Sequence, residues 1–384
     1  MNKTLLLGNE AVARGLYEAG VTVVSAYPGT PSTEITENVV QYEGDIYCEW
    51  APNEKVAFEV AFGAATGGAR AFCAMKHVGL NVAADPLYTA SYIGVNAGMV
   101  CAVADDPGMH SSQNEQDSRR HAIAAKVPML EPCDSAECLA YTKQAFALSE
   151  QFDTPVLLRL STRISHSRSL VTLSDRENRP LKEYRKDVMK NVMMPAMAKG
   201  AHVRVEKRTE ALRQWAETSG INRIEYNDKR IGIICAGTCY TYAKEALGER
   251  ASYLKLGMVN PLPVQLIVEF ARNVGQVYVI EELDDIIETH CRKHGVPVIG
   301  RLPAGGRIFP GHRARGAARR NAAQRGLCGR HSRPAPRAVR RLPPPRAVRR
   351  AQKAEGIRQR GHRLLHPGRV GAAVEHRRVR VHGR

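Results

Sequence analysis

The feature that most constrains the fold is a regular alternation of short apolar segments with helical patterns over residues 1–170. Strands are expected at 21–27, 69–75, 98–104, 127–132 and 155–160, and the clearest helix at 135–151. Alternation of this kind builds a mostly parallel sheet with helices on both faces. We therefore predict an α/β fold for this part of the chain.

The stretch 49–81 carries the strongest candidate site. Glu54 opens a helix of small residues, which Gly67 and Gly68 end. The strand at 69–75 follows, and a polar turn at 76–81 is expected at its carboxyl end, where open α/β sheets bind ligands. Glu54 is therefore a candidate cofactor contact. A carboxylate that only complements the dipole of its helix explains the same position.

A second turn, at 28–34, contains Pro and Gly and follows the strand at 21–27. Ser32 or Thr33 is expected to cap the next helix, with Glu34 in its first turn.

The rest of the first 300 residues divides into a connector and a second α/β unit. Residues 171–228 are charged, rich in Met and poor in strand patterns, so we expect a helical connector packed on the first domain. The second unit is expected over 229–300. Its predicted strands are 231–238, 252–257, 277–282 and 296–300.

The composition of the chain bears on its cellular location and on its metal sites. No run of about twenty apolar residues is present, which is the length that a transmembrane helix needs. The apolar part of the amino terminus is too short for a signal peptide. We therefore expect a cytoplasmic protein without a membrane partner. Nine cysteines are scattered without a CxxC pair, which argues against an iron–sulfur cluster or a zinc ribbon in this chain and fits reduced thiols.

The positive charge lies entirely in the last part of the chain. Residues 301–384 carry 23 Arg and one Lys against two Glu, a formal charge of +22. Residues 1–300 carry 32 basic and 36 acidic side chains, a formal charge of −4. The first 300 residues are thus slightly acidic, whereas 301–384 has almost no aromatic residues and no hydrophobic periodicity with which to bury a core.

Six motifs occur in order along the first 300 residues. They are Tyr27–Glu34 (YPGTPSTE), Asn53–Glu59 (NEKVAFE), Met75–Asn81 (MKHVGLN), Asp105–Arg119 (DDPGMHSSQNEQDSR), Leu256–Pro263 with its LG and PLP, and Val279–Leu283 (VIEEL). Together they resemble the α subunit of indolepyruvate:ferredoxin oxidoreductase, one of the thiamine-diphosphate-dependent 2-oxoacid:ferredoxin oxidoreductases. The resemblance covers roughly residues 1–300.

This resemblance implies a domain order. Residues 1–170 would be a pyrimidine-type thiamine-diphosphate-binding domain, 171–228 the connector, and 229–300 a domain like the carboxyl-terminal domain of transketolase. In such enzymes a glutamate hydrogen-bonds a ring nitrogen of the aminopyrimidine, and the cofactor's imino nitrogen then takes the proton from its reactive carbon. By position Glu54 resembles that glutamate.

The resemblance also implies further site residues. Expected catalytic residues are Glu54 and His77, and expected substrate-binding residues are Thr30 and Arg119. Expected cofactor contacts are Tyr27, Pro28, Gly29, Glu54, Gly79 and Asn81. Thr30 would contact the carboxylate of the 2-oxoacid, and Arg119 could pair with a carboxylate as well. An Arg or a His in a polar loop also fits a solvated side chain.

The implied activity is the oxidative decarboxylation of aryl pyruvates to acyl-CoA, with a β subunit and with ferredoxin as electron acceptor. Coenzyme A and an aryl pyruvate would be the substrates. An α subunit for another 2-oxoacid, pyruvate or 2-oxoglutarate, is the alternative within the family. The intact family protein would also hold Mg²⁺ and [4Fe-4S] clusters, whose ligands are absent from this chain. We therefore expect the chain to be inactive alone.

The Arg-rich tail has two interpretations. It could be an arm that binds the phosphates of a nucleic acid. Alternatively, it is a reading of the wrong frame, because codons for 301–384 can be chosen that spell motifs of the family's thiamine and Mg²⁺ region one base later. We favour a frameshift near Gly300, a disordered tail without evolved function, and no nucleic-acid partner.

Overall fold

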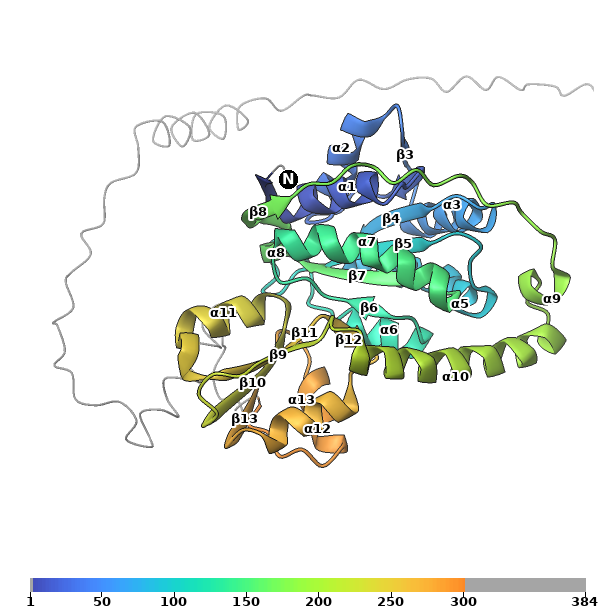
Figure 1. The fold of residues 1–384 in the computed structure, drawn as a ribbon. Helices are drawn as coiled ribbons and strands as arrows, with labels where there is room; N and C mark the ends of the chain where they lie inside the picture. The colour runs from blue at the N-terminus through green and yellow to red at the C-terminus, as the bar shows by residue number, and fades with distance from the viewer. Residues whose placement is uncertain (1–2, 301–384) are drawn as a thin grey trace, which may run out of the picture. The chain divides into compact units, whose positions relative to one another are not determined.

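The structure, a computed structural model, describes residues 3–300, and Figure 1 shows its ribbon. The expectations for 301–384, including its disorder, lie outside the described residues.

The central sheet has seven strands in the spatial order β12-β6-β7-β5-β4-β2-β3. These are β2 (Val23–Ala26), β3 (Tyr47–Trp50), β4 (Ala71–Lys76), β5 (Met99–Asp105), β6 (Met129–Leu130), β7 (Val156–Ser161) and β12 (Met258–Asn260). All neighbouring pairs are parallel except β12 with β6. The predicted parallel α/β sheet is confirmed.

Every residue of β4, β5 and β7 is buried, as expected for strands that are covered on both faces. Successive residues of β4 alternate between the two layers. Phe72 packs with residues of α1 (Gly8–Glu18) and α7 (Ser135–Phe152). Cys73 packs with residues of α3 (Glu54–Thr66) and α5 (Ala84–Ile93) on the other face.

Besides α1, α3, α5 and α7, this unit contains α2 (Thr33–Val39), the 3₁₀ turn η1 (Val40–Tyr42), α4 (His77–Val82), α6 (Arg119–Ala125) and α8 (Thr162–His166). Residues at the helix ends explain where some of the helices begin. Asp134 caps α7 by accepting a hydrogen bond from Glu137 N, and the helix predicted at 135–151 is confirmed. The helix that Glu54 was expected to open is confirmed as α3.

Two local expectations are wrong. Residues 76–81 are not a polar turn, because α4 begins at His77 directly after β4 and packs on α3 and α5. Ser32 does not cap α2, because its hydroxyl donates to Gly29 O at 2.7 Å instead. Thr33 Oγ1 accepts from Gly29 N at 2.8 Å, so both hydroxyls hold the preceding turn.

The connector is helical only in its second part. β8 (Arg168–Thr172) pairs with β1 (Lys3–Leu7) in a two-stranded antiparallel sheet, and residues 173–187 then run without helix along the first unit. The helices are α9 (Val188–Asn191) and α10 (Pro195–Thr218). The first part stays extended because it bonds to the first unit: Arg176 donates to Tyr17 O and Val21 O at 2.9 Å each, and Lys182 N to Gly68 O.

The second sheet has four strands in the order β13-β10-β11-β9. Its strands are β9 (Arg223–Glu225), β10 (Ile231–Ala236), β11 (Ser252–Leu256) and β13 (Gln276–Ile280), and its helices are α11 (Gly237–Leu247), the 3₁₀ turn η2 (Gly248–Arg250), α12 (Val264–Arg272) and α13 (Ile286–Lys293). The strand predicted at 296–300 is wrong, since only a single bridge joins Ile299 to Tyr278. β12 pairs with β6, so residues from the expected second unit extend the central sheet.

Within residues 3–300, no helix combines the length and the apolar character that crossing a membrane requires.

Candidate functional site

Three polar segments meet at one edge of the central sheet. Residues 27–32 follow β2, α4 follows β4, and residues 106–118 follow β5. β4 pairs in parallel with both β2 and β5, so the carboxyl ends of the three strands lie side by side. This is the edge at which open α/β sheets bind ligands.

Glu54 contributes a carboxylate that no other residue of 3–300 pairs with. It is the first residue of α3, which Asn53 caps by accepting from Val56 N at 3.0 Å. Its half-buried side chain lies against α4, where a Cβ on Gly79 would stand only 2.6 Å from Glu54 Oε1. No hydrogen bond or ion pair within residues 3–300 occupies the Glu54 carboxylate. A glycine at 79 thus leaves room for a carboxylate that is free to bind a ligand.

His77 is the first residue of α4 and is only 1% exposed. Neither Nδ1 nor Nε2 of its ring has a hydrogen-bond partner among the described residues. Buried polar atoms are normally hydrogen-bonded. A partner for the His77 ring would therefore have to come from outside residues 3–300.

The turn after β2 is held rigid from two sides. Besides the bonds from the hydroxyls of Ser32 and Thr33, the buried Asn9 of α1 donates to Pro31 O at 2.8 Å. The turn therefore presents Thr30 at the surface, where this residue is exposed.

The remaining predicted cofactor contacts belong to the same segments. Tyr27 and Pro28 are exposed at the start of the β2 turn, and Gly29 is half-buried in it. Asn81 is exposed on α4, one helical turn after His77. The structure thus brings the segments of all predicted cofactor contacts to one sheet edge.

Asp106 organises the loop that follows β5. Its carboxylate accepts from Ser111 N at 2.8 Å, from Ser112 Oγ at 2.6 Å and from Thr162 Oγ1 at 2.7 Å. Burial alone raises the pKa of a carboxyl, but these hydrogen bonds outweigh it and lower the pKa of Asp106 to about 2. Asp106 is therefore ionised at neutral pH and holds Ser111 in place.

Ser111 links the other two segments. Lys76 Nζ, at the end of β4, donates to Ser111 O at 2.8 Å and lies 3.4 Å from Ser111 Oγ. Ser111 Oγ in turn donates to Thr30 O at 3.3 Å. Lys76 and Thr30 are thus bridged by one residue of the loop.

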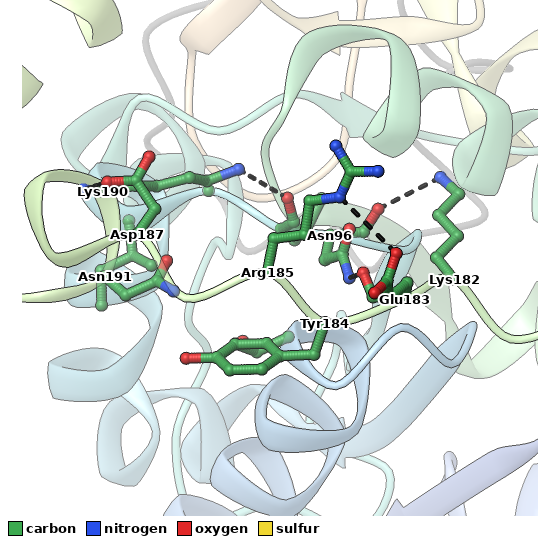
Figure 2. A pocket seen from close by; sticks show the side chains of 12 residues that line it. Asn96, Lys182, Glu183, Tyr184, Arg185, Asp187, Lys190 and Asn191 are labelled. Carbon is green, nitrogen blue, oxygen red and sulfur yellow. Dashed lines mark hydrogen bonds and ion pairs between the residues drawn. The ribbon is translucent and has the colours of Figure 1, made fainter.

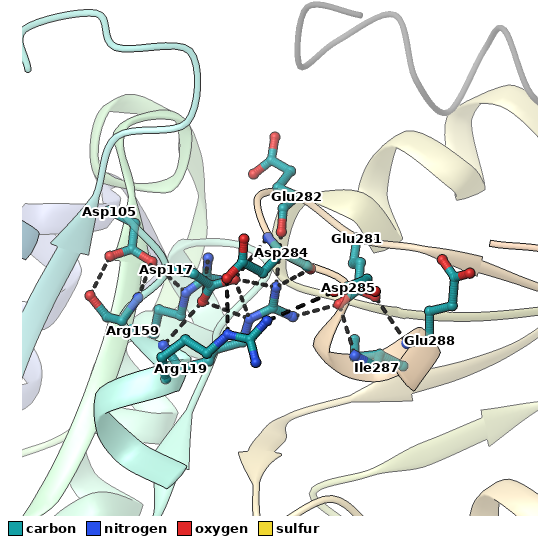
Figure 3. A network of polar contacts seen from close by, with 12 residues as sticks. Asp105, Asp117, Arg119, Arg159, Glu281, Glu282, Asp284, Asp285, Ile287 and Glu288 are labelled. Carbon is teal, nitrogen blue, oxygen red and sulfur yellow. Dashed lines mark hydrogen bonds and ion pairs between the residues drawn. The ribbon is translucent and has the colours of Figure 1, made fainter. Parts of the chain in front are cut away.

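Arg119 lies in a buried ion-pair network instead of at the surface (Figure 3). Its guanidinium donates to Asp117 at 2.6 Å and to Glu281 at 2.8 Å. It also donates to the carbonyl oxygens of Glu282 and Asp284 at 2.9 Å each. Arg119 therefore ties the end of the β5 loop to the segment between β13 and α13.

Arg159 of β7 extends this network with ion pairs to Asp105 and to Glu131, each at 2.8 Å. Burial opposes ionisation of Asp117, but the attraction of Arg159 and Arg119 outweighs it and lowers the pKa of that carboxyl. Burial raises the pKa of Asp105 and of Glu281. The network is a buried cluster in which carboxylates outnumber the two arginines.

These contacts change the role expected for Arg119. A substrate ligand needs a donor that faces the site, whereas this side chain is 1% exposed and enclosed by carboxylates and carbonyl groups. We revise its role to positioning the loop that carries Ser111.

Sequence reasoning did not assign roles to Asn9, Lys76, Asp106 and Ser111. Lys76, Asp106 and Ser111 lie inside the family motifs, so the motifs could have identified them as candidates. Asn9 lies outside every motif, and only its packing against the β2 turn identifies it.

A cavity of about 500 Å³ lies at the opposite edge of the sheet (Figure 2). It is lined by the end of α3, by residues 93–96 before β5, and by residues 182–191 of the connector. Its lysines are already paired: Lys182 donates to Asn96 O at 3.1 Å, and Lys190 to Asp153 Oδ1 at 2.8 Å. It contains none of the predicted site residues.

Among residues 3–300, no three His, Cys, Asp or Glu side chains come together in a group that could hold a metal ion. The eight cysteines of this part of the chain form no disulfide.

Comparison with known proteins places this chain in a family. A profile described as "Pyruvate flavodoxin/ferredoxin oxidoreductase, thiamine diP-bdg" matches residues 14–223. "Indolepyruvate oxidoreductase subunit IorA" of Archaeoglobus fulgidus is 42% identical over 312 residues, which cover 78% of this chain and 50% of that protein. The subunit of the same name from Methanothermobacter thermautotrophicus is 45% identical over 296 residues, covering 75% and 48%. The chain spans about half the length of the curated relatives it matches.

Two solved structures share the fold. A "2-oxoglutarate:ferredoxin oxidoreductase from Magnetococcus marinus" superposes with a TM-score of 0.69 at 17% identity, covering 83% of this chain and 65% of that chain. A "Split gene transketolase, inactive beta4 tetramer" superposes with a TM-score of 0.51 at 15% identity, covering 82% and 96%. At these identities the likeness shows the α/β fold alone. The family profile and the identity to the archaeal subunits, taken together, show that the chain belongs to the pyruvate flavodoxin/ferredoxin oxidoreductase family and carries its thiamine diphosphate-binding domain.

Proposed function

We propose that the chain is part of the α subunit of an indolepyruvate:ferredoxin oxidoreductase. The observation that carries the proposal is the Glu54 carboxylate, which lies against Gly79 at the carboxyl edge of the sheet and has no partner among residues 3–300. The name of the archaeal relatives supports the choice of indolepyruvate.

The residues at this edge fit thiamine diphosphate. When bound, the cofactor supplies a nucleophilic carbon that adds to the 2-oxo group of the substrate. Glu54, whose carboxylate occupies the space that Gly79 leaves, would hold a ring nitrogen of the cofactor's aminopyrimidine by a hydrogen bond. His77, whose two ring nitrogens have no partner in the described part of the chain, would hold or move a proton close to that ring. Thr30 would contact the carboxylate of the substrate.

The rest of the assembly would come from outside the described residues. A β subunit and ferredoxin are the proposed partners, coenzyme A and an aryl pyruvate the substrates, and the cytoplasm the place of action. We propose that Mg²⁺ with the diphosphate, and the [4Fe-4S] clusters, are held by the half of the family protein that this chain does not match. The chain alone would then be inactive.

A different 2-oxoacid is the second candidate. "2-oxoglutarate synthase subunit KorA" of Methanothermobacter thermautotrophicus is 28% identical over 178 residues, 44% of this chain and 47% of that protein. The higher identity and longer match of the indolepyruvate subunits favour an aryl pyruvate.

Reconstitution tests the proposal. The chain would be combined with the second half of the Methanothermobacter thermautotrophicus subunit and with a β subunit, and viologen reduction measured with thiamine diphosphate and Mg²⁺. We expect reduction that depends on indolepyruvate and coenzyme A, and none with the chain alone. Faster turnover of 2-oxoglutarate would favour the second candidate. An inactive mixture, beside an active control with the intact archaeal subunit, would contradict the proposal.

The nucleotide sequence around the Gly300 codon tests the proposed frameshift. We expect a second open frame beyond this codon that encodes the remaining family motifs. If the DNA holds no such frame, the basic segment was selected as it stands, and binding to nucleic acid becomes the better explanation for it.

A further inference from the structure

One buried cation of the structure differs from the others. The buried basic side chains are Arg70, Lys76, Arg119, Arg159 and Lys255. Four of them pair with a carboxylate: Arg70 with Glu150 at 3.0 Å, Arg119 with Asp117 at 2.6 Å, Arg159 with Asp105 at 2.8 Å, and Lys255 with Glu137 at 2.5 Å. Lys76 has no carboxylate partner within residues 3–300, although it is only 9% exposed.

No carboxylate among residues 3–300 forms an ion pair with Lys76. Its ammonium group has three donors, and the partners of these donors are the carbonyl oxygen and the hydroxyl of Ser111. Both groups are neutral. Burying a charge without an opposite charge is costly, so a buried ammonium in a built site calls for an anion. At least one of its donors is left for that anion.

The position of Lys76 indicates which anion this is. A Cβ on Gly29 would stand 3.1 Å from Lys76 Cβ, so the stem of Lys76 packs under the β2 turn. Its ammonium is bridged through Ser111 to Thr30, and both of those residues are exposed. Lys76 therefore lies just beneath the surface that faces the proposed substrate.

The chemistry of thiamine separates two possible anions. Its reactive carbon is bonded to the ring nitrogen that carries the pyrimidine, whereas the diphosphate is attached through an ethyl chain at the other side of that ring. Lys76 is the last residue of β4, and α4 follows directly. Gly79 of α4 is the residue against which Glu54 lies. A cation on the pyrimidine side is placed for the group that reacts there, not for the diphosphate.

We propose that Lys76 binds the carboxylate of the 2-oxoacid substrate through a charge-assisted hydrogen bond, with Ser111 and Thr30 orienting it. The identity of the substrate rests on the proposed function. The presence of an anion site rests only on the burial and the contacts of Lys76. Lys76 then affects mainly the binding of the substrate and not the chemical step, because the carboxylate that it pairs with is already ionised in the free substrate.

The experiment compares two ligands of the same shape on the full 384-residue chain. Phenylpyruvate carries a carboxylate, and phenylacetone has a methyl group in its place. We expect calorimetry to show that the chain binds phenylpyruvate at least about tenfold more tightly than phenylacetone, the gain of one charge-assisted contact. Equal binding of the two ligands, or no binding of phenylpyruvate, would overturn the proposal.

Variants assign the difference to Lys76. Lys76→Met should remove the preference for phenylpyruvate without changing the binding of phenylacetone, and Lys76→Arg should restore part of it. Lys143→Met is the matched control, because Lys143 pairs with Glu18 at 3.0 Å on another face and should leave the preference intact. Circular dichroism monitors folding. If Lys76→Met does not fold, Lys76→Gln replaces it, and the comparison of ligands on the unchanged chain still decides.

Two further measurements separate the outcomes. Pyrophosphate should compete weakly with phenylpyruvate, and competition that is strong and lost in Lys76→Met would mean that the lysine serves the diphosphate instead. In the reconstituted assembly, Lys76→Met should raise KM for the aryl pyruvate more than it lowers kcat. An active assembly with unchanged KM would defeat the role of Lys76 but leave the proposed function. If phenylpyruvate binds through Lys76 but the assembly oxidises no aryl pyruvate, the role of Lys76 would stand and the proposed function would fail.

Discussion

The carboxylate of Glu54 lies directly against the backbone of Gly79, so that a Cβ at position 79 would stand 2.6 Å from Glu54 Oε1. This contact joins the first residue of α3 to α4, the helix that follows β4. It places an acidic side chain at the sheet edge where the turn of Thr30 and the loop of Ser111 also lie.

Gly79→Ala should displace the Glu54 carboxylate without unfolding the chain. The three atoms nearest to the added methyl group all belong to the flexible Glu54 side chain, and Ala favours a helix over Gly by about 1 kcal/mol. We expect unchanged or slightly higher thermal stability, together with a loss of viologen reduction in the reconstituted assembly. Gly63→Ala is the control, because a Cβ there meets nothing within 4 Å. Full activity in Gly79→Ala would show that the position of Glu54 is not critical.

Glu54→Gln should abolish activity while preserving the fold. Gln keeps the shape of the side chain but cannot carry the charge or exchange the proton that the cofactor's ring requires. We expect the rate of the reconstituted assembly to fall by about 10²–10⁴-fold, with a melting temperature close to that of the unchanged chain. Glu59→Gln, an exposed residue of the same helix, should retain the rate. Similar rates in the two variants would argue that Glu54 only complements the helix dipole.

Arg119→Met should destabilise the chain far more than Arg120→Met. Removing Arg119 takes from the buried Asp117 and Glu281 the guanidinium that hydrogen-bonds both carboxylates, at a cost of about 3–5 kcal/mol. Arg120 is 59% exposed and pairs with Asp284 at the surface, so its loss should cost about 0.5 kcal/mol. Urea unfolding measures both. If Arg119→Met keeps its stability but loses substrate binding, Arg119 is a substrate ligand after all.

Asp106→Asn should be destabilising at neutral pH but not in acid. The folded pKa of Asp106, about 2, lies below the usual value of 3.8, so the ionised carboxylate adds stability above pH 4. This contribution, about 2 kcal/mol, is lost as the pH falls through the folded value. Unfolding free energies of the two proteins should therefore converge between pH 5 and about pH 2. Asp85→Asn, at an exposed side chain, is the control, and a difference that is constant with pH would contradict the explanation.

Much of the fold follows from local patterns. The strands that became β2, β4, β5, β7, β10, β11 and β13 were predicted close to their observed bounds, because a run of apolar residues between turn residues suffices to mark a buried strand. The helix that begins at Glu54 was also evident, since small residues at helical spacing follow Asn53, which caps it.

Other elements depended on partners that are distant in sequence. β12 has three residues and becomes a strand because β6 lies beside it. Residues 76–81 look like a polar turn when read alone, but they form a helix because α3 and α5 offer a surface on which α4 packs. The first part of the connector stays extended because Gly68, Tyr17 and Val21 supply partners for its backbone and side chains.

Residue types at fixed spacing were enough to predict the α/β class and to reveal the family motifs, and the resemblance carried by those motifs singled out Glu54 as a candidate. The burial of Arg119 in an ion-pair network, and of Lys76 without a carboxylate partner among residues 3–300, could be seen only in the three-dimensional contacts. The two side chains carry the same charge and both stand in polar motifs. What separates them is which groups the fold brings within hydrogen-bond distance, and no local pattern contains that information.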